Sequence, residues 1–344
     1  MLVNMDTPSL SVIIPTFNRK DSLLRTLDNL NLQSIPDGSF EVIVVDDGSI
    51  DDSESVRDIE WLYSLQYVRQ ENRGAHYARN EGAKISRAPV IIFIDDDVTI
   101  QQDALYELRR FCLSNPQSIV IGKVFQRCDG EETIFSRNEM HQQNSRLSNE
   151  NESVSPPECN TQFLAVRRDD FFEIGMMRDP IGRRPTWDDV ELGYRAHLLG
   201  FSIMRCASAV AEHWDYVISD LHTASNRWRA ASRGAVRLFQ VHPGLVKMLP
   251  MFRDKTPVSW KEDPVPLILR KRFRHIATSK PIMTALVSLV TFLERSSAFV
   301  VILRPLYRWI IGGSIYRGFQ EGLIEFGLLN DEDRLNGRYA LKRD

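Results

Sequence analysis

The sequence lacks several features that would assign a chain of this length to a familiar class. Its 344 residues contain only four cysteines, Cys112, Cys128, Cys159 and Cys206, and no two of them form a CxxC pair. This spacing argues against a zinc ribbon or a disulfide framework, and it predicts free thiols in a reducing compartment. The first residues also lack a basic stretch followed by an apolar run. We therefore expect no secretory signal and a cytoplasmic location.

Two signatures of nucleotide-binding proteins are also missing. The sequence contains neither GxGxxG, the turn of dinucleotide-binding folds, nor GxxxxGK[ST], the P-loop. The first absence weakens the case for a dinucleotide cofactor, and the second argues against a P-loop enzyme. A nucleoside diphosphate held by a metal ion fits the remaining features best.

The charge of the chain is small in total but unevenly distributed. Hydrophobic residues make up 43% of the chain and charged residues 26%, with a net charge of −3, which is ordinary for a globular enzyme. Between residues 232 and 317, however, Lys and Arg occupy fifteen positions against four for Asp and Glu. This asymmetry predicts that the later part of the chain meets a polyanion, either a nucleic acid or an anionic membrane surface.

The first hundred residues alternate between strand and helix patterns. Residues 10–14 and 40–45 predict buried strands, and leucines at helical spacing predict a helix between them. A short strand over 61–68 and a helix over 75–84 lead to a further strand over 90–94. This order is typical of βαβ units, so we expect an α/β fold whose mostly parallel sheet brings the strand ends to one edge.

Three consecutive carboxylates, Asp95, Asp96 and Asp97, follow the five apolar residues of the strand over 90–94. Adjacent carboxylates repel one another and raise one another's pKa, so a cation or a set of hydrogen-bond donors is expected among them. An acidic turn that ends a strand explains the same residues. The triplet alone leaves these two interpretations open.

The alternation continues as far as residue 220. We expect a helix over 103–113, strands over 118–125, 161–166 and 202–209, and helices over 169–174 and 188–199. The polar stretch 129–157 is interpreted as a mobile loop, either a lid or acceptor-binding insertion or a passive surface excursion.

Five motifs then occur in an order that resembles the family-two glycosyltransferases of the GT-A fold. They are Ser11-Val12-Ile13-Ile14-Pro15-Thr16-Phe17-Asn18, Val44-Val45-Asp46-Asp47-Gly48-Ser49, Asn72-Arg73-Gly74 with Ala78-Arg79-Asn80, Ile94-Asp95-Asp96-Asp97, and Trp187-Asp188-Asp189-Val190-Glu191-Leu192. The resemblance covers roughly the first two thirds of the chain. It implies a GT-A catalytic domain over residues 1–225, followed by a basic, helical region over 226–344.

The resemblance also implies roles for individual residues. Asp97 is the expected ligand of Mn²⁺ or Mg²⁺, His213 a further metal ligand, and Asp189 the general base. The expected contacts of the nucleotide-sugar donor are Pro15, Phe17, Asn18, Asp47, Arg79, Asp95 and Asp96. The chain has Asp188 where the family often has Glu. At the N-terminus of a helix, Asp189 is expected to stay ionised at neutral pH.

The last third contains two apolar segments, 281–292 and 297–311, which Glu294-Arg295 and Arg304-Pro305 interrupt. Each is shorter than the ~18–20 apolar residues of a spanning helix. One interpretation is a helical hairpin in the interface of an anionic membrane, next to the basic run at 270–274. The other is a helical subdomain that packs on the catalytic domain. No nucleic-acid-binding motif is present, and no nucleic-acid partner is expected.

The hypothesis from the sequence is an inverting, metal-dependent glycosyltransferase. It would transfer a sugar from a nucleoside-diphosphate sugar to a glycan or lipid-linked acceptor, at the inner face of the cytoplasmic membrane. A nucleotidyltransferase and a catalytically silent sugar-nucleotide sensor are the alternatives. The sequence does not identify the nucleotide base or the sugar of the donor, nor the acceptor.

Overall fold

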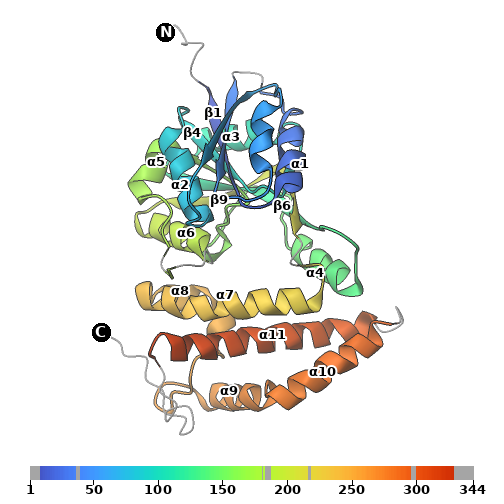
Figure 1. The fold of residues 1–344 in the computed structure, drawn as a ribbon. Helices are drawn as coiled ribbons and strands as arrows, with labels where there is room; N and C mark the ends of the chain where they lie inside the picture. Colours follow the sequence, from blue (N-terminus) through green and yellow to red (C-terminus); the bar gives the residue numbers. More distant parts are fainter. Residues whose placement is uncertain are drawn as a thin grey trace. The chain divides into compact units, whose positions relative to one another are not determined.

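The computed structural model describes residues 8–35, 39–179, 181–182, 187–215, 218–295 and 300–328. The chain divides into two compact units (Figure 1). The first, called the sheet unit here, consists of residues 1–127 and 143–215. The second, called the helical unit, consists of residues 128–142 and 216–344.

In the described part of the chain, the sheet unit is built on a nine-stranded sheet with the order β3-β2-β1-β4-β8-β6-β9-β5, and β7 pairs with β9. Strands β1 to β4 are parallel to one another, whereas β8 runs antiparallel to β4 and β6. The parallel part confirms that the ends of β1, β2 and β4 lie at one edge. The strands are β1 Leu10–Thr16, β2 Phe40–Asp46, β3 Ser64–Arg69, β4 Val90–Ile94, β5 Val98–Ile100, β6 Ser118–Cys128, β7 Glu152–Ser153, β8 Phe163–Arg167 and β9 Ser202–Asp215.

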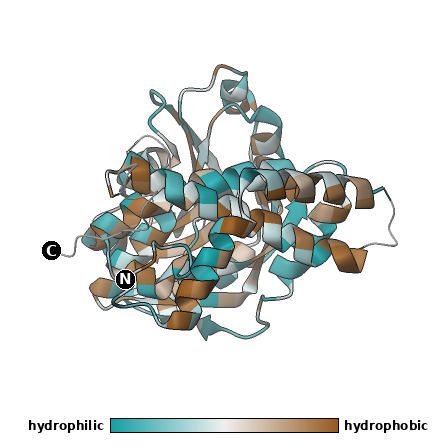
Figure 2. Ribbon diagram, turned by 90° about the horizontal axis from the view of Figure 1, so that it is seen from below, coloured by the Kyte–Doolittle hydropathy of each residue, from teal (hydrophilic) through white to brown (hydrophobic). Residues whose placement is uncertain are grey.

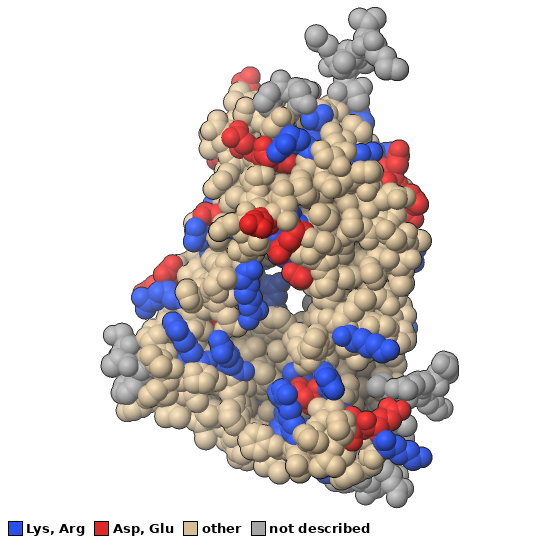
Figure 3. Space-filling view, turned by 180° about the vertical axis from the view of Figure 1, so that it is seen from behind, with Lys and Arg blue, Asp and Glu red and all other residues tan. Residues whose placement is uncertain are grey.

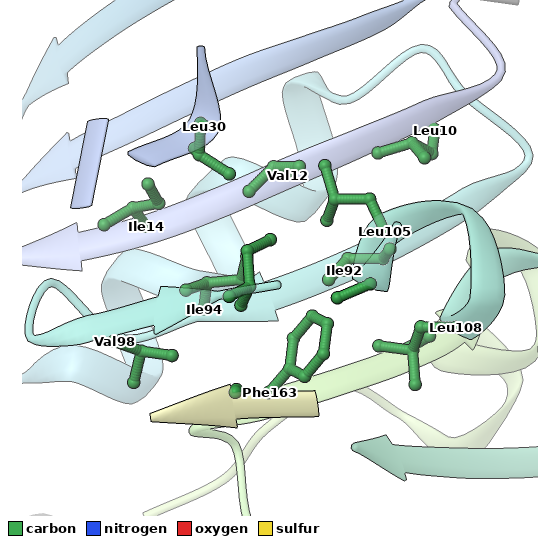
Figure 4. Close-up of a cluster of buried hydrophobic side chains, with 14 of the residues drawn as sticks. Leu10, Val12, Ile14, Leu30, Ile92, Ile94, Val98, Leu105, Leu108 and Phe163 are labelled. Atoms are coloured by element: carbon green, nitrogen blue, oxygen red, sulfur yellow. The ribbon is translucent and has the colours of Figure 1, made fainter. Parts of the chain in front are cut away.

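Apolar side chains cover both faces of the central strands, as the unbroken apolar runs predict. In β1, Val12 and Ile14 belong to one core cluster while Ile13 belongs to the other. Figure 4 shows the first cluster, in which Ile92 and Ile94 of β4 lie near Phe163 of β8. Helices α1 and α3 pack on this face, and α2, α5 and α6 pack on the opposite face. These helices are α1 Lys20–Leu30, α2 Ala75–Ile85, α3 Ala104–Ser114, α5 Arg168–Ile174 and α6 Asp188–Leu198.

The polar stretch 129–157 is not the loop that the sequence predicted. It contains the helix α4, Ile134–Asn144, together with β7 and a short 3₁₀ helix, Pro156–Glu158. Thr133 begins α4 by accepting a hydrogen bond on Oγ1 from Ser136 N at 3.0 Å, an N-terminal cap. Phe135 is buried in the helical unit. A few buried side chains therefore stabilise a helix whose composition is otherwise that of a loop.

The helical unit consists mainly of helices, most of them long. They are α7 Leu221–Val241, α8 Leu245–Met248, α9 Val265–Ala277, α10 Lys280–Leu293 and α11 Val300–Glu325. Helix α11 continues through Pro305, which lies inside it. Leu303, Tyr307 and Ile310 are buried in one cluster across this point. Their packing outweighs the hydrogen bond that proline cannot make.

Helix α11 lies alongside α7 (Figure 1). Glycines make this close approach possible. A Cβ atom at Gly318 would lie 2.0 Å from the carbonyl oxygen of Arg229, and one at Gly322 would lie 2.4 Å from that of Arg233. Two glycines four residues apart stand on one helix face. They therefore allow the two helix backbones to touch.

None of the helices among the described residues is, by itself, long and apolar enough to span a membrane. Helices α9 and α10 meet this criterion of length and composition only as a pair, with a bend of 69° between them.

Candidate active site

The candidate site lies at the edge of the sheet where the parallel strands end. β1 leads into Phe17, Asn18 and Arg19, and β4 leads into the aspartate triplet. β5 pairs antiparallel with β9, which places Val98 opposite His213. The backbone N–H of Trp214 donates to the carbonyl oxygen of Asp97 at 2.9 Å. Residues more than a hundred positions apart are thereby held at one sheet edge.

Asp96 connects the ends of β1 and β4. One of its carboxylate oxygens accepts from Thr16 Oγ1 at 2.8 Å, and the other accepts from Arg19 Nη1 at 3.1 Å. Its backbone carbonyl accepts from Thr26 Oγ1 at 2.9 Å. Burial raises the pKa of Asp96 to about 7, against the opposing charge of Arg19. The carboxylate of Asp96, the middle residue of the triplet, is therefore already hydrogen-bonded to other side chains of the protein.

Asp97 has one oxygen directed to each of two partners. Its Oδ2 accepts from Arg19 Nη1 at 2.7 Å, and its Oδ1 lies 3.1 Å from His213 Nε2. Although burial opposes it, the nearby His213 and the hydrogen-bonded charge of Arg19 hold the pKa of Asp97 below its usual value. The pKa of His213 is raised by Asp97, although burial alone would lower it. The mutual repulsion expected for the triplet therefore describes Asp96 but not Asp97.

His213 is oriented by two glutamines. Its Nδ1 lies 2.8 Å from Gln126 Oε1 and 2.9 Å from Gln162 Nε2. When Nδ1–H donates to the Gln126 oxygen, Nε2 is the atom left facing Asp97. Such an outer partner fixes the ring of a metal-binding histidine.

Asp95, Asp97 and His213 form a candidate metal centre. Each offers one ligand atom, and these atoms lie within 4.8 Å of one another. Asp97 Oδ1 is buried, and despite its proximity to His213 it has no well-aligned hydrogen bond among the described residues. A buried oxygen of this kind has free capacity for a cation. Two carboxylates and one imidazole are a ligand set that fits a divalent ion.

Arg79 joins the triplet to the acidic pair at the start of α6. It is buried, donates to Asp95 through Nη2, and places Nη1 3.9 Å from Asp188 Oδ2. Because one guanidinium faces both carboxylates, it keeps the metal centre and the acidic pair at a fixed spacing. The sequence singled out Arg79 for the donor site, and the structure places it between Asp95 and Asp188.

Asp189 lies at the N-terminus of α6, directly after Asp188. Its Oδ1 accepts from the N–H of Val190 at 2.8 Å. Burial, together with the charge of Asp188, raises the pKa of Asp189 to about 7. The expectation that the helix dipole keeps this group ionised at neutral pH is therefore wrong, because burial and a neighbouring carboxylate outweigh the dipole. Trp187, just before the pair, has a left-handed backbone with φ of 78°, a strained conformation that occurs often at functional sites.

The residues predicted to contact the nucleotide fall into two groups. Phe17 is 44% exposed, whereas Pro15 is buried within β1. Asn18 has a left-handed φ of 53°, and its Oδ1 accepts from the N–H of Ile50 at 2.7 Å. This bond joins the loops that follow β1 and β2. Phe17 presents an aromatic ring to solvent, and Asn18 orders the loop beside it.

The carboxylate of Asp47 accepts hydrogen bonds from nearby residues of the protein. Its Oδ1 accepts from Gln70 Nε2 at 2.6 Å and from the N–H of Arg73 at 2.9 Å, and its Oδ2 accepts from the N–H of Gly74 at 2.7 Å. The buried carboxylate thus holds the loop before α2. Gly74 has φ of 102° in this loop, a conformation open to glycine.

Several residues of the site were not identified from the sequence. Arg19, Gln126 and Gln162 bind the triplet or His213, and only the fold brings the two glutamines near. A basic residue just after the first strand was the one available signal for Arg19. His76 is also buried, and neither ring nitrogen has a hydrogen-bond partner among the described residues.

Residues 11–175 match the sequence model of glycosyl transferase family 2. The chain is 31% identical over 116 residues to the poly(ribitol-phosphate) beta-N-acetylglucosaminyltransferase TarP of Staphylococcus aureus, covering 33% of this chain and 36% of TarP. It is 45% identical over 94 residues to the validoxylamine A glucosyltransferase of Streptomyces hygroscopicus, covering 26% of this chain and 21% of that relative. The chain thus spans about a third or less of the length of these relatives.

Two solved structures share the fold. The mannosyltransferase PcManGT of Pyrobaculum calidifontis, in complex with GDP-Man and Mn²⁺, has a TM-score of 0.56 and 17% identity, covering 92% of this chain and 88% of PcManGT. GalNAc-T7 with UDP, GalNAc and Mn²⁺ has a TM-score of 0.52 and 16% identity, covering 80% of this chain and 56% of GalNAc-T7. The architecture is that of the GT-A glycosyltransferases. Residues 11–175 are thus similar to glycosyl transferase family 2.

Proposed function

We propose that this protein is an inverting, metal-dependent glycosyltransferase that transfers a sugar from a nucleoside-diphosphate sugar to an acceptor hydroxyl. The observation that carries the proposal is the arrangement of two acidic groups around Arg79. On one side lie Asp95, Asp97 and His213, and on the other lie Asp188 and Asp189. A metal centre and a candidate base thus share one sheet edge.

The metal centre is the proposed site for the donor's diphosphate. Asp97 Oδ1, Asp95 and His213 Nε2 would hold the ion, while Arg19 retains the other oxygen of Asp97. A bound divalent ion supplies positive charge against the departing diphosphate. The imidazole in the ligand set favours Mn²⁺ over Mg²⁺, which prefers oxygen ligands alone.

Asp189 is the proposed general base. In its ionised form it takes the proton of the acceptor hydroxyl while that oxygen forms a bond to the anomeric carbon. The bond from this carbon to the diphosphate breaks, and its electron pair leaves with the diphosphate. Attack from the face opposite the leaving group inverts the anomeric configuration. A pKa of about 7 suits a base that must be ionised near neutral pH.

Pro15, Phe17, Asn18 and Asp47 are proposed to form the nucleotide side of the pocket. Phe17 can offer its exposed ring to a base. Asn18 and Asp47 act by holding the two surrounding loops, since their side chains bind backbone N–H groups. Asp96 supports the ends of β1 and β4 beneath them.

Donor turnover with substituted protein tests the proposal. Asp189→Asn should abolish transfer while leaving Mn²⁺-dependent donor binding, and Asp97→Asn should weaken both. Glu173→Gln, an exposed carboxylate on α5, is the matched control and should change neither. A fully active Asp189→Asn protein would contradict the assignment of the base. Pyrophosphate released from a nucleoside triphosphate and a sugar phosphate would indicate a nucleotidyltransferase, and donor binding without turnover would indicate a sensor.

The acceptor is proposed to be a glycan or a lipid-linked glycan in polysaccharide biosynthesis. Two relatives support the class: TarP, and a poly(ribitol-phosphate) beta-glucosyltransferase of Bacillus spizizenii that is 34% identical over 122 residues and of which the chain covers 19%. Both names describe transfer to a polymer. No nucleic-acid partner is proposed.

The helical unit is proposed to bind the inner face of the cytoplasmic membrane, with catalysis assigned to residues 1–225 and membrane contact to 226–344. Leu269, Phe273 and Ile276 of α9 and Phe292 of α10 are each more than 60% exposed. Figure 2 shows hydrophobic and hydrophilic residues alternating along the helices of this unit. On the face of the unit seen in Figure 3, basic side chains stand beside acidic ones on a largely uncharged surface. The apolar side chains would therefore contribute most of the binding.

Vesicle flotation tests this attachment. Phe273→Ser should lower the fraction bound to vesicles that contain an anionic lipid. Leu62→Ser removes an even more exposed apolar side chain from the sheet unit and should have no effect. Equal flotation of the Phe273→Ser protein and the unsubstituted protein would contradict attachment through α9.

A further inference from the structure

A cavity lies entirely within the helical unit. It has a volume of about 590 Å³ and is bordered by the first turns of α7, by α10 and by α11. This volume is in the range of small-ligand sites. The residues that border it belong to neither the metal centre nor the acidic pair. The proposed transfer reaction therefore does not account for this cavity.

Hydroxyl groups form one wall of this cavity. Thr284, Ser288 and Thr291 of α10 all border it. Residues at this spacing lie on one helix face. Ser225 of α7 and Ser314 of α11 add hydroxyls from the other walls, and Ser225 Oγ is buried without a hydrogen-bond partner among the described residues. Thr291 Oγ1 donates to the carbonyl oxygen of Val287 at 3.0 Å, so its lone pairs remain to accept, and Ser225 Oγ can both donate and accept.

Two guanidinium groups also border the cavity, those of Arg229 and Arg317. Burial and the positive charge of Arg229 lower the pKa of Arg317, and the carboxylate of Glu321 offsets only part of this. Arg317 donates through Nε and Nη2 to the carbonyl oxygen of Thr278, at 3.1 Å and 3.0 Å, so no carboxylate hydrogen-bonds to it among the described contacts. Arg229 is paired with Glu321. An anion beside Arg317 would relieve the repulsion between the two cations.

The acidic residues at the cavity are already engaged. Asp220 Oδ1 accepts from the N–H groups of His222 and Thr223, at 2.8 Å and 2.9 Å, as the cap of α7. Glu294 Oε1 accepts from the hydroxyl of Tyr307 at 2.7 Å. Both carboxylates therefore have hydrogen bonds that orient them within the protein, and the positive end of α7 offsets the charge of Asp220.

We propose that this cavity binds a phosphorylated polyol, with the phosphate held at Arg317 and the polyol hydroxyls facing the hydroxyl row of α10. Guanidinium groups are suited to phosphate because they can donate two parallel hydrogen bonds. A phosphate without hydroxyls would leave the α10 row unused, and a neutral polyol would leave Arg317 without an anion. A free polyol phosphate and the head group of a phospholipid share this chemistry.

Calorimetric titration of the full-length protein with sn-glycerol 3-phosphate tests the free ligand, and flotation with phosphatidylglycerol vesicles tests the lipid. Whichever of the two probes binds, Arg317→Gln should weaken its binding by about tenfold or more, since the change removes a hydrogen bond to a charged group. Ser288→Leu fills the cavity from an exposed position on α10 and should weaken binding of the probe without a change of charge. Arg272→Gln, an exposed arginine outside the cavity that lies over Trp260, is the control for charge and should leave it within about twofold.

Loss of binding in both cavity variants and retention in the Arg272→Gln protein supports the proposal, and the titration and the flotation identify the source of the ligand. The proposal is overturned if neither probe binds, if both cavity variants bind as the unsubstituted protein does, or if the control weakens binding equally. Donor turnover by Ser288→Leu should stay unchanged, because Ser288 lies outside the catalytic machinery. A failure of this proposal is thereby distinguishable from a failure of the proposed transferase.

Discussion

The Nε2 atom of His213 lies 3.1 Å from Oδ1 of Asp97, and the two groups change one another's protonation in opposite directions. The pKa of His213 is raised and that of Asp97 is lowered. For the histidine, the resulting stabilisation of the metal-free protein is complete below the usual imidazole pKa and is lost as pH rises through the raised one. A metal ion at this pair must displace the proton of His213.

The affinity for Mn²⁺ should therefore increase with pH. Competition from the proton is strongest below the raised pKa of His213 and disappears above it. Titration of Mn²⁺ followed by electron paramagnetic resonance at pH 6 and pH 8 measures the effect. His213→Gln should bind the ion more weakly and with little dependence on pH. Glu212→Gln removes the neighbouring side chain, which pairs with Arg127, and should behave as the unsubstituted protein.

The rate of sugar transfer should rise with pH through about 7, because Asp189 can accept a proton only when it is ionised. Removing the charge of Asp188 takes away the largest of the charge effects that raise this pKa. Asp188→Asn should therefore shift the acidic limb of the profile to lower pH, whatever its effect on the maximal rate. The measurement is the initial rate at saturating donor from pH 5 to pH 9. An unshifted limb would contradict the coupling of the two carboxylates.

Replacing Asp189 by Asn should stabilise the fold above pH 7. The folded protein raises the pKa of this group to about 7, so it binds the proton more tightly than the unfolded chain does. Stability is therefore lost as pH rises from the usual aspartate pKa to about 7, and the loss is complete above that value. The Asn variant should melt at a higher temperature than the unsubstituted protein at pH 8, and the difference should shrink at pH 4. A lower melting temperature at pH 8 would indicate that the ionised carboxylate has a stabilising partner.

Gly318→Ala should destabilise the helical unit by about 1–3 kcal/mol, the usual cost of overpacking. The added methyl group would stand 2.0 Å from the carbonyl oxygen of Arg229, and backbone cannot yield as a side chain can. Gly312→Ala is the matched control in the same helix, since its nearest neighbour is Arg274 Nη1 at 3.6 Å. That change should be neutral or should stabilise α11 through helix propensity. Urea unfolding followed by circular dichroism compares the two variants.

The strands and helices of the sheet unit were largely predictable, because their apolar patterns are simple. β4 is apolar throughout and is buried on both faces, and α1 buries Leu23, Leu27 and Leu30 at helical spacing. The common edge of β1, β2 and β4 also follows from the parallel arrangement. The local pattern of apolar residues is thus enough to predict a strand or helix when the element itself contains that pattern.

Other features depend on partners that are distant in the sequence. Gln126 and Gln162 contact His213 only because three strands meet in the sheet. Helix α4 has a polar sequence and is stabilised by burial of Phe135. The raised pKa of Asp189 comes from burial, which its position at a helix N-terminus does not reveal. Such tertiary effects leave no periodic trace along the chain.

The helical unit takes residues 128–142 from the middle of the chain and the rest from its end. Phe135 and Tyr307 stack edge to face there, with ring centroids 5.1 Å apart. During synthesis, the segment around Phe135 leaves the ribosome long before Tyr307 is made. At a synthesis rate of ~5–20 residues per second, the apolar side chains of this segment remain without Tyr307 for roughly ten to thirty seconds. A fragment that ends after the sheet unit would keep this segment without its partner, so aggregation of the nascent or truncated chain should begin at α4.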